Sequence, residues 1–549
     1  MTDIHPPRGS NTHLTNTTRL VLLMLRRERL ETGISVLAMV VGSIALAAFM
    51  STRFDPASRQ ALILTLNNPG IIAMMGPVYG LDDYTVGAMY ANTVMLWMVM
   101  AAAVVNILLV IRLTLADEQK GLTEIIRSLP VGRLASLHAA MTVVLIVNVV
   151  VALAVGVGIY AVSDVSLDLA SSLLYGAALG VCSLYFAALA AVCAQVASGS
   201  RSAIGISLAA MALLYLMRAV GDMGCEPLSR LSALGLVLRT QVFVNNQVWP
   251  LLLILLQALA LAALAYLLNL QRDSGSGLLP ARPGRSRASG WLQTPGGLAL
   301  RLSKSTITAW AVAVFLLAAS YGSALGSIDS FVAENAFYQQ LVGLDAYGDD
   351  FTMTMIFATF VTAILNMLSL VPLLLVTLKT LFEEKDGRAD PVMSTGVSRY
   401  RYMLSHTGLA FAASLVFPCL AALGLYATAA VVLPDADAAG IGLVFLSKAN
   451  LVFLPAFWLM IGFATFVVGL FPKAVNAVWI YYSCIFFVTL AWDFVPEWMT
   501  RISPFAWLPK LPVDSLATVS DWLPMLVVTA IAAVLTAAGL VGYRRRDLA

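Results

Sequence analysis

Two charged segments with the same pattern of residue types recur in this sequence. They read LADEQKGLTEIIRSLPVGR (Leu115–Arg133) and LFEEKDGRADPVMSTGVSR (Leu381–Arg399), and each follows a long apolar run. They align without a gap at an offset of 266 residues, so that two acids, a glycine and a closing arginine fall in register. This repetition predicts a matched pair of docking surfaces to which another protein attaches.

The residues after the shared glycine predict a short helix in each charged segment. After Gly121 the apolar residues recur at i, i+3, i+4 and i+7 up to Pro130, which is typical of an amphipathic helix. In the second segment, Asp390 and Pro391 fit an N-cap and a first helical position, with the helix running towards Ser398. Such a helix can lie in a groove of a partner. The alternative is a solvated loop beside the membrane, which either copy alone favours, whereas the gapless repetition favours docking.

The candidate docking residues are the acids, glycines and arginines of the two charged segments. They are Asp117, Glu118, Gly121, Glu124, Arg133, Glu383, Glu384, Gly387, Arg388, Asp390 and Arg399.

The composition places the chain in a membrane. Of its residues, 60% are hydrophobic and 11% are charged, and the mean hydropathy is +0.86. Many apolar runs reach the roughly 20 residues that a helix needs to cross a bilayer, and the alternating segments of a membrane barrel are absent. We therefore predict an all-α integral membrane protein. Its twelve transmembrane helices are expected at 32–51, 92–114, 135–162, 168–197, 202–220, 249–270, 305–327, 351–379, 405–432, 443–470, 474–491 and 522–542.

Lysine and arginine are unevenly distributed between the two sides of these spans. With both termini inside, the inner segments hold 25 of the 33 Lys and Arg residues, and the outer loop 328–350 holds none. The N-terminal 18 residues are polar and show no signal peptide. These features predict a multi-pass membrane protein with both termini cytoplasmic. The net charge of +3 follows from this loop bias and gives no sign of a nucleic-acid partner.

No cluster in the sequence has the residue types of a catalytic or metal site. Four of the five cysteines fall within spans, and the four histidines are scattered. We therefore predict no catalytic residue and no metal ligand in this chain.

The spans divide into two halves of six. A linker rich in Gly, Pro, Ser and Arg, residues 271–304, separates a first transmembrane unit, 1–270, from a second, 305–549. Because six is an even number, both halves have the same orientation in the membrane. The repeat is therefore parallel rather than inverted.

Each half carries the same parts in the same order. A basic lead-in, Arg19–Glu31 or Leu300–Ser305, precedes the first span, and the former is long enough for an elbow helix in the membrane interface. The charged segment follows the second span. Between the fifth and sixth spans lie residues 221–250 and 492–524, which are too polar to span and too apolar for a simple loop. They predict an outer re-entrant hairpin in each half.

This order of parts resembles the permease subunits of type-two ATP-binding-cassette (ABC) exporters. Several strings are similar to the polyketide-antibiotic and multidrug exporter branch, in which two such units are fused in one chain. These strings are NPGIIAMMGPVYGLD (68–82), RDSGSGLLPARPG (272–284), EEKDGRADPVMSTGVSRYRYMLSH (383–406) and GYRRRDL (542–548). Together with the layout, the resemblance covers essentially the whole chain, and it implies a location in the bacterial plasma membrane.

The resemblance implies a division of labour. The charged segments would be coupling helices on which two copies of a cytoplasmic ABC ATPase dock. ATP and Mg²⁺ would belong to that partner, because the pattern G-x-x-x-x-G-K-[ST] does not occur in this chain, and the chain itself would hold no cofactor. The first half departs from the branch: it has Gly121-Leu122 where the second keeps Gly387-Arg388. We therefore expect the second segment to contribute more than the first to coupling with the ATPase.

In the family resembled, the second and fifth spans of each unit line the substrate route. Methionine and aromatic side chains adapt to large apolar substrates, although each is more often a packing or lipid-facing residue. The candidate pathway residues on these spans are Trp97, Met98, Met100, Asn106, Met211, Tyr215, Met353, Phe357, Phe360, Asn366, Tyr482 and Phe486.

We therefore predict the permease subunit of an ATP-driven exporter of amphipathic compounds, such as antibiotics, drugs or lipids. The alternative is an ion-coupled twelve-span antiporter, a class that normally keeps carboxylates at membrane depth. The spans here are nearly free of carboxylates, and the first charged segment lacks the Asp-Arg core of the loop typical of that class. A membrane enzyme or scaffold that transports nothing is a third hypothesis.

Overall fold

A computed structural model describes residues 14–546 except 57–58, 61, 64–71, 73, 273–276, 279–286, 288, 326–352, 434–440, 491–496 and 510–518. The described residues form helices joined by turns and contain no strand, which confirms the all-α class. The chain separates into two compact units, Met1–Gly284 and Arg285–Ala549. The acidic loop predicted at 328–350 lies outside the described residues.

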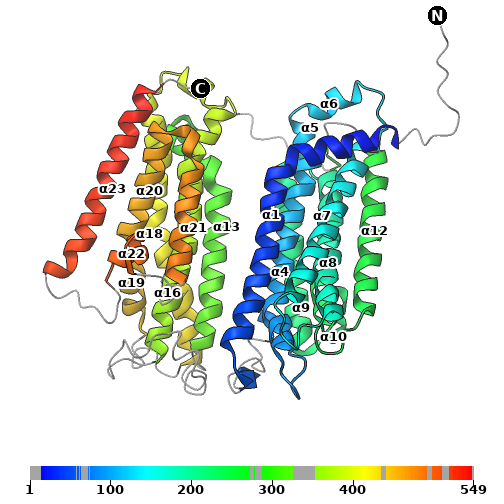
Figure 1. The fold of residues 1–549 in the computed structure, drawn as a ribbon. Helices are drawn as coiled ribbons and strands as arrows, with labels where there is room; N and C mark the ends of the chain where they lie inside the picture. Colours follow the sequence, from blue (N-terminus) through cyan, green and yellow to red (C-terminus); the bar gives the residue numbers. More distant parts are fainter. Residues whose placement is uncertain are drawn as a thin grey trace, which may run out of the picture. The chain divides into compact units, whose positions relative to one another are not determined.

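Unit 1 is a bundle of long helices with short helices at both ends (Figure 1). Its helices are α1 (Thr17–Arg53), α4 (Val86–Ile111), the π-helical turn η2 (Arg112–Ala116), α5 (Asp117–Gln119), α6 (Leu122–Arg127), α7 (Ala135–Tyr160), α8 (Leu169–Val196), α9 (Ser200–Gly224), α10 (Glu226–Leu231), α11 (Ala233–Leu238) and α12 (Trp249–Gln271).

Unit 2 is built in the same way. Its helices are η3 (Gly290–Gln293), α13 (Pro295–Ala324), α16 (Met353–Lys385), α17 (Ala389–Met393), α18 (Arg399–Val432), α19 (Leu443–Leu451), α20 (Leu454–Leu470), η6 (Pro472–Ala474), α21 (Asn476–Leu490), α22 (Glu497–Thr500), η8 (Pro504–Trp507) and α23 (Val519–Arg545).

Among the described residues, eleven helical stretches are long and apolar enough to cross a membrane. They overlap eleven of the spans expected from the sequence. The remaining one, expected at 474–491, is the apolar helix α21, which has 15 residues against the roughly 20 that a full crossing needs. The number twelve therefore stays a prediction. The linker expected at 271–304 ends in helix, because α13 begins at Pro295.

Side-chain caps fix where several long helices begin. The first N–H groups of a helix have no partner within it, and an unpaired group is costly where water is excluded. Thr85 accepts a hydrogen bond from the Ala88 N–H (3.2 Å) at the start of α4. Asp168 accepts one from the Ser171 N–H (3.1 Å) at the start of α8. The same arrangement starts α18 at Ser398.

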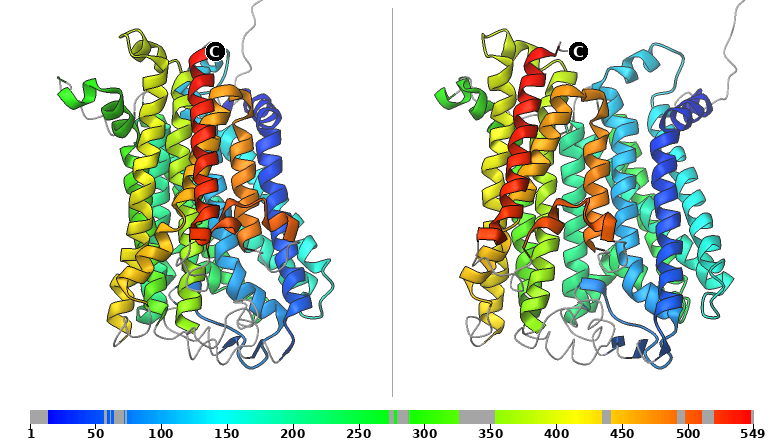
Figure 2. Two further views of the ribbon diagram at one scale, coloured as in Figure 1. Left: turned by 90° about the vertical axis from the view of Figure 1, so that its left-hand side faces the viewer. Right: turned by 60° about the vertical axis from the view of Figure 1, so that its left-hand side comes forward.

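The N-terminal part of α1 runs across the end of unit 1 that carries α5 and α6, and the helix then turns along the bundle (Figures 1 and 2). Leu20, Val21 and Met24 are buried in the core of the unit. Arg26 and Arg29 remain exposed. The elbow helix predicted around Arg19–Glu31 falls in this part of α1.

Glycine allows close contact between α20 and α23, which run side by side in unit 2 (Figure 2). A Cβ on Gly469 would lie 2.0 Å from the carbonyl oxygen of Gly539, and one on Gly462 would lie 2.6 Å from that of Ala532. In a bilayer the hydrophobic effect does not drive helices together, so close packing of small residues holds them. Replacement of Gly469 must therefore separate the two helices.

We predict that Gly469→Ala destabilises unit 2. An added methyl group in a packed interior costs about 1–3 kcal/mol. The measurement is the thermal unfolding of the purified protein in detergent. Gly408→Ala in α18 is the matched control, because a Cβ there meets no atom within 4 Å and alanine favours the helix. Equal unfolding temperatures for the two variants would contradict the close contact.

Candidate functional site

The two acidic pairs lie at the end of the second long helix of each unit. Asp117 and Glu118 belong to α5, which continues α4 through η2. Glu383 and Glu384 lie near the C-terminus of α16. Three of these four residues are buried: Asp117, Glu383 and Glu384. A carboxylate is unfavourable when buried and also at the C-terminus of a helix, where the helix dipole is negative. Each of these acids therefore requires a cation.

The second acid of each pair contacts an arginine that follows the last helix of its unit. Arg272, directly after α12, donates from Nη2 to Glu118 Oε2 (2.9 Å). Arg546, directly after α23, donates from Nη2 to both carboxylate oxygens of Glu384 (2.7 and 2.5 Å). Only 3% of the Glu384 side chain is exposed. We call Arg272 and Arg546 the terminal arginines.

The closing arginine of each charged segment reinforces this contact. Arg133 donates from Nη2 to the main-chain carbonyl of Arg272 (3.3 Å). Arg399 donates from Nη1 to that of Arg546 (2.5 Å). Both ends of each charged segment are therefore attached to the last helix of the same unit.

The first acid of each pair has a different partner in the two units. Asp117 accepts a hydrogen bond from Arg27 of α1 (2.7 Å). Glu383 accepts two from Arg388 of its own segment (2.6 and 3.1 Å). The hydrogen bond to Glu383 is the main cause of a raised pKa at Arg388. The first segment is thus attached to α1, whereas the acid of the second is neutralised locally.

Gly121 and Gly387 make the same turn after the acids. Their φ angles are +73° and +67°, and a Cβ on either would meet no atom within 4 Å. Each N–H bonds to the carbonyl three residues earlier, of Glu118 (3.0 Å) or Glu384 (2.9 Å). The left-handed backbone, rather than a lack of space, favours glycine here.

The short helices after these glycines expose different surfaces. In α6, Ile125 is 66% exposed, and Leu129 just beyond the helix is 60% exposed. Glu124 is also exposed. In α17, Asp390 and Pro391 are exposed, whereas the apolar Val392 and Met393 pack against the core of unit 2.

The sequence misplaces the start of the second short helix. It predicts Asp390 as the N-cap, but α17 begins at Ala389 with Arg388 as the N-cap and ends at Met393. Asp390 lies inside the first turn, where a carboxylate is also favourable because it faces the free N–H groups. Both positions suit an aspartate, so the residue type alone does not distinguish them.

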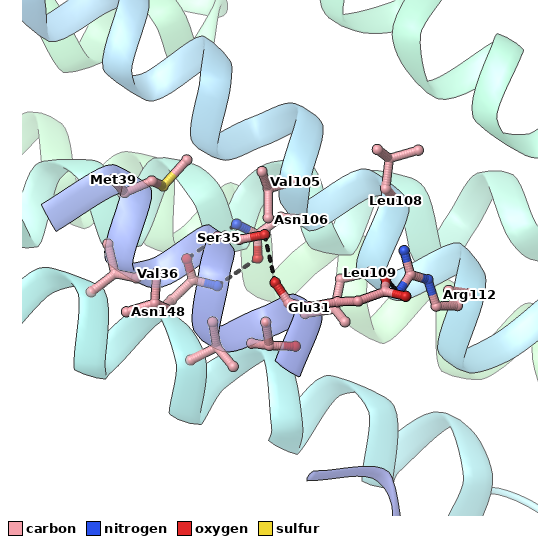
Figure 3. A pocket seen from close by; sticks show the side chains of 13 residues that line it. Glu31, Ser35, Val36, Met39, Val105, Asn106, Leu108, Leu109, Arg112 and Asn148 are labelled. Carbon is pink, nitrogen blue, oxygen red and sulfur yellow. Dashed lines mark hydrogen bonds and ion pairs between the residues drawn. The ribbon is translucent and has the colours of Figure 1, made fainter. Parts of the chain in front are cut away.

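A small cavity lies beside Asn106, between α1, α4 and α7. Its volume is about 100 Å³, and Glu31, Ser35 and Arg112 lie around it. Figure 3 shows the side chains of Asn106 and Asn148 next to each other in its lining. Each side-chain amide donates to the carbonyl oxygen of the other (2.7 and 3.3 Å). The cavity is smaller than the roughly 300–1,000 Å³ typical of drug-sized ligands.

Unit 2 contains a similar amide pair. Asn366 of α16 donates to Asn450 of α19 (2.7 Å), and both side chains are buried. Such hydrogen bonds between membrane helices contribute about 0.6 kcal/mol on average. Asn106 and Asn366 therefore pair helices within their own units.

The other candidate pathway residues occupy varied environments. Trp97 is exposed and Met211 is buried. Tyr482 donates to the Met367 carbonyl of α16 (3.2 Å) and lies beside Phe486, with ring centroids 6.2 Å apart. Those that are partly buried are Met98, Met100, Tyr215, Phe357, Phe360, Tyr482 and Phe486. The side chain of Met353 lies outside the described residues.

A buried ion pair lies at the opposite end of unit 1 from α6. Arg218 and Asp222 of α9 are 3.4 Å apart, and their side chains are 0% and 2% exposed. Arg218 also donates to the Met74 carbonyl (3.0 Å), as does Tyr215 (3.0 Å). Ser229 donates to Asp222 (2.6 Å). This network attaches the α1–α4 connection and α10 to α9, and it gives the pathway candidate Tyr215 a structural contact.

Sequence reasoning missed the partners of the docking residues. Arg272 and Arg546 stand in the basic stretches at the end of the last helix of each unit, Asn269–Asp273 and Tyr543–Asp547. Both stretches end in Arg-Asp. This shared ending is the signal in the sequence that Arg272 and Arg546 occupy equivalent positions in the two units. Among the described residues there is no group of three His, Cys, Asp or Glu side chains that could hold a metal ion.

The chain is similar to proteins of multidrug efflux. A family model described as the C-terminal domain of multidrug efflux system permease Rv1217c matches residues 292–544. The multidrug efflux system permease protein Rv1217c of Mycobacterium tuberculosis (strain ATCC 25618 / H37Rv) is 30% identical over 549 residues, which cover 99% of this chain and 97% of that protein.

We predict that Arg218→Met strongly destabilises unit 1. The substitution leaves the Asp222 carboxylate buried without the Arg218 cation. Removing one partner of a buried ion pair lowers the free energy of unfolding by about 3–5 kcal/mol. The measurement is again thermal unfolding in detergent. Arg230→Met removes an exposed arginine that pairs with Glu226 and should leave the unfolding temperature unchanged. A loss no larger than that of this control would contradict the role of the buried pair.

Proposed function

This chain belongs to the family of multidrug efflux system permeases, and from that premise we propose that it is the permease subunit of an ATP-driven exporter. A separate ATPase supplies the energy and docks on the two charged segments. The substrates are amphipathic compounds such as antibiotics, drugs or lipids.

One observation carries this proposal. A glycine turn with the same backbone follows an ion-paired acidic pair in each unit, and both charged segments are attached to the end of their unit's last helix. The long helices end in a short surface helix at the same place twice. One docking surface per unit matches a partner present in two copies.

The exposed residues of the segments indicate the form of the contact. Ile125 and Leu129 offer apolar side chains for a groove in the ATPase. The second segment exposes the charged side chains of Arg388, Asp386 and Asp390, and Phe382 is exposed near its start. The buried acids face inward, so their contribution to docking is to hold each segment in place. The two ATPase copies therefore meet different surfaces.

Hydrolysis belongs to the partner in this proposal. The phosphate-binding pattern G-x-x-x-x-G-K-[ST] is absent from the sequence. Docking at these segments places them, and with them both termini, on the cytoplasmic side of the membrane. The Lys and Arg bias of the loops supports the same orientation.

We predict that the chain co-purifies with two copies of its ATPase and that Ile125→Asp weakens this complex at least tenfold. Ile125 would be buried in the partner. A loss of about 1.4 kcal/mol in binding free energy lowers the affinity tenfold, and burial of one isoleucine side chain contributes more than that. The measurement is the affinity of the purified subunits, with the mass of the complex giving the ratio.

Val165→Asp is the matched control for this variant. Val165 is a fully exposed apolar residue in the turn between α7 and α8, at the other end of the unit from α6, and should not alter binding. Unchanged affinity of the Ile125→Asp variant would remove α6 from the contact. Robust ATP hydrolysis by this chain alone would overturn the division of labour.

We also predict that ATP hydrolysis, and not an ion gradient, drives export. The spans hold almost no group that could cycle a proton. In vesicles that contain the complex, transport of an amphipathic dye should continue when the proton gradient is collapsed and stop when the ATPase is disabled. Transport driven by an imposed pH gradient without nucleotide would favour the ion-coupled antiporter.

A further inference from the structure

The last helix of each unit is attached to the charged segment in the same way. The acids Glu118 and Glu384 are 266 positions apart, as are Arg133 and Arg399, while the terminal arginines are 274 apart. In both units the terminal guanidinium binds the acid, and the closing arginine binds the terminal carbonyl. Three residues in each unit thus form one contact that occurs twice.

The surroundings of this contact differ between the units. The first acid pairs with Arg27 in unit 1 and with Arg388 in unit 2. A π-helical turn precedes the acids in unit 1, whereas α16 is a continuous α-helix at its corresponding end. The exposed surfaces of α6 and α17 also differ. The contact to the last helix is therefore common to both units although the contacts around it are not.

The terminal arginines are placed to transmit force. Arg272 also reaches the main-chain carbonyl of Ala194 and the side chain of Gln195, both at 3.4 Å, at the C-terminus of α8. The guanidinium of Arg546 lies 5.2 Å from the ring centre of Tyr543 in α23. Both arginines are at least four-fifths buried. A charge-assisted hydrogen bond that is shielded from water is strong and directional, so displacement of the segment either carries the helix with it or separates a buried ion pair.

We propose that Arg272 and Arg546 are positioning residues that couple the charged segments to α12 and α23. When the ATPase displaces a segment, the terminal arginine moves the last helix of that unit with it. This inference rests on the proposed function, because it assumes that a docked ATPase displaces the charged segment. The new point is which helix of each unit moves with that segment.

The test uses the full chain reconstituted with its ATPase and measures dye transported per ATP hydrolysed. The variants are Arg272→Gln, Arg546→Gln and the two combined. We expect the combined variant to lose at least tenfold in this ratio while it binds the ATPase within twofold of the wild type. Arg230→Gln, which removes an exposed arginine far from the segments, should keep the wild-type ratio.

Charge exchange separates coupling from simple stability. Glu118→Arg with Arg272→Glu, and Glu384→Arg with Arg546→Glu, restore an ion pair in reverse. Each exchange should bring the ratio at least threefold closer to the wild type than the corresponding arginine variant alone. If the glutamine variants do not fold, Arg272→Lys with Arg546→Lys takes their place. This variant keeps both charges but not the several hydrogen bonds of each guanidinium. Its ratio of dye transported to ATP hydrolysed should be at least threefold lower than that of the wild type.

Two results would overturn the inference. One is a wild-type ratio in the combined glutamine variant or, where that does not fold, in the lysine variant. The other is an exchange variant that folds and binds the ATPase yet stays as uncoupled as the arginine variant alone. Failure of the proposed function gives a different result. Vesicles that contain the wild-type chain or any of the variants at positions 272 and 546 would then transport dye without ATP hydrolysis.

Discussion

The burial of a carboxylate at the end of a membrane helix is the constraint on which this structure depends. Glu384 is buried and the Glu118 side chain is 17% exposed, and both lie at the negative ends of their helices, where the dipole disfavours an anion. A cation must therefore come from elsewhere in the unit, and it comes from the end of the last helix. This requirement brings the second and sixth long helices together at one end of the bundle. The glycine turn, the short helix and the closing arginine are arranged around that ion pair.

The two units use one scaffold with different surfaces. Close packing at glycine holds the helices, as between Gly469 and Gly539, and buried amide pairs join neighbouring helices in both units. The scaffold differs at its surface, since Ile125 of α6 is exposed whereas Val392 and Met393 of α17 are partly buried against the core of unit 2. The two units therefore have the same kind of internal packing but present different side chains at the surface.

Composition and repetition in the sequence were enough for the class of the protein. Apolar runs of bilayer length predict an all-helical membrane protein, and eleven of the described helices have that length. The order of parts and the local strings predict the exporter resemblance, which the multidrug efflux permease relative confirms. A window of about 20 residues is enough to recognise each span, and the resemblance needs only the order of such parts along the chain.

Contacts between distant residues were decided only by the tertiary structure. Glu118 and Arg272 are 154 positions apart, and Glu384 and Arg546 are 162 apart, so no local pattern pairs them. The sequence predicts these acids as part of a docking surface, because the charged segment occurs twice without a gap. In the structure the same acids are turned inward by arginines at the end of each unit, and the exposed surface is formed by residues such as Ile125. The sequence determines which groups carry charge, whereas the packing of the last helix determines which of those charges still face water.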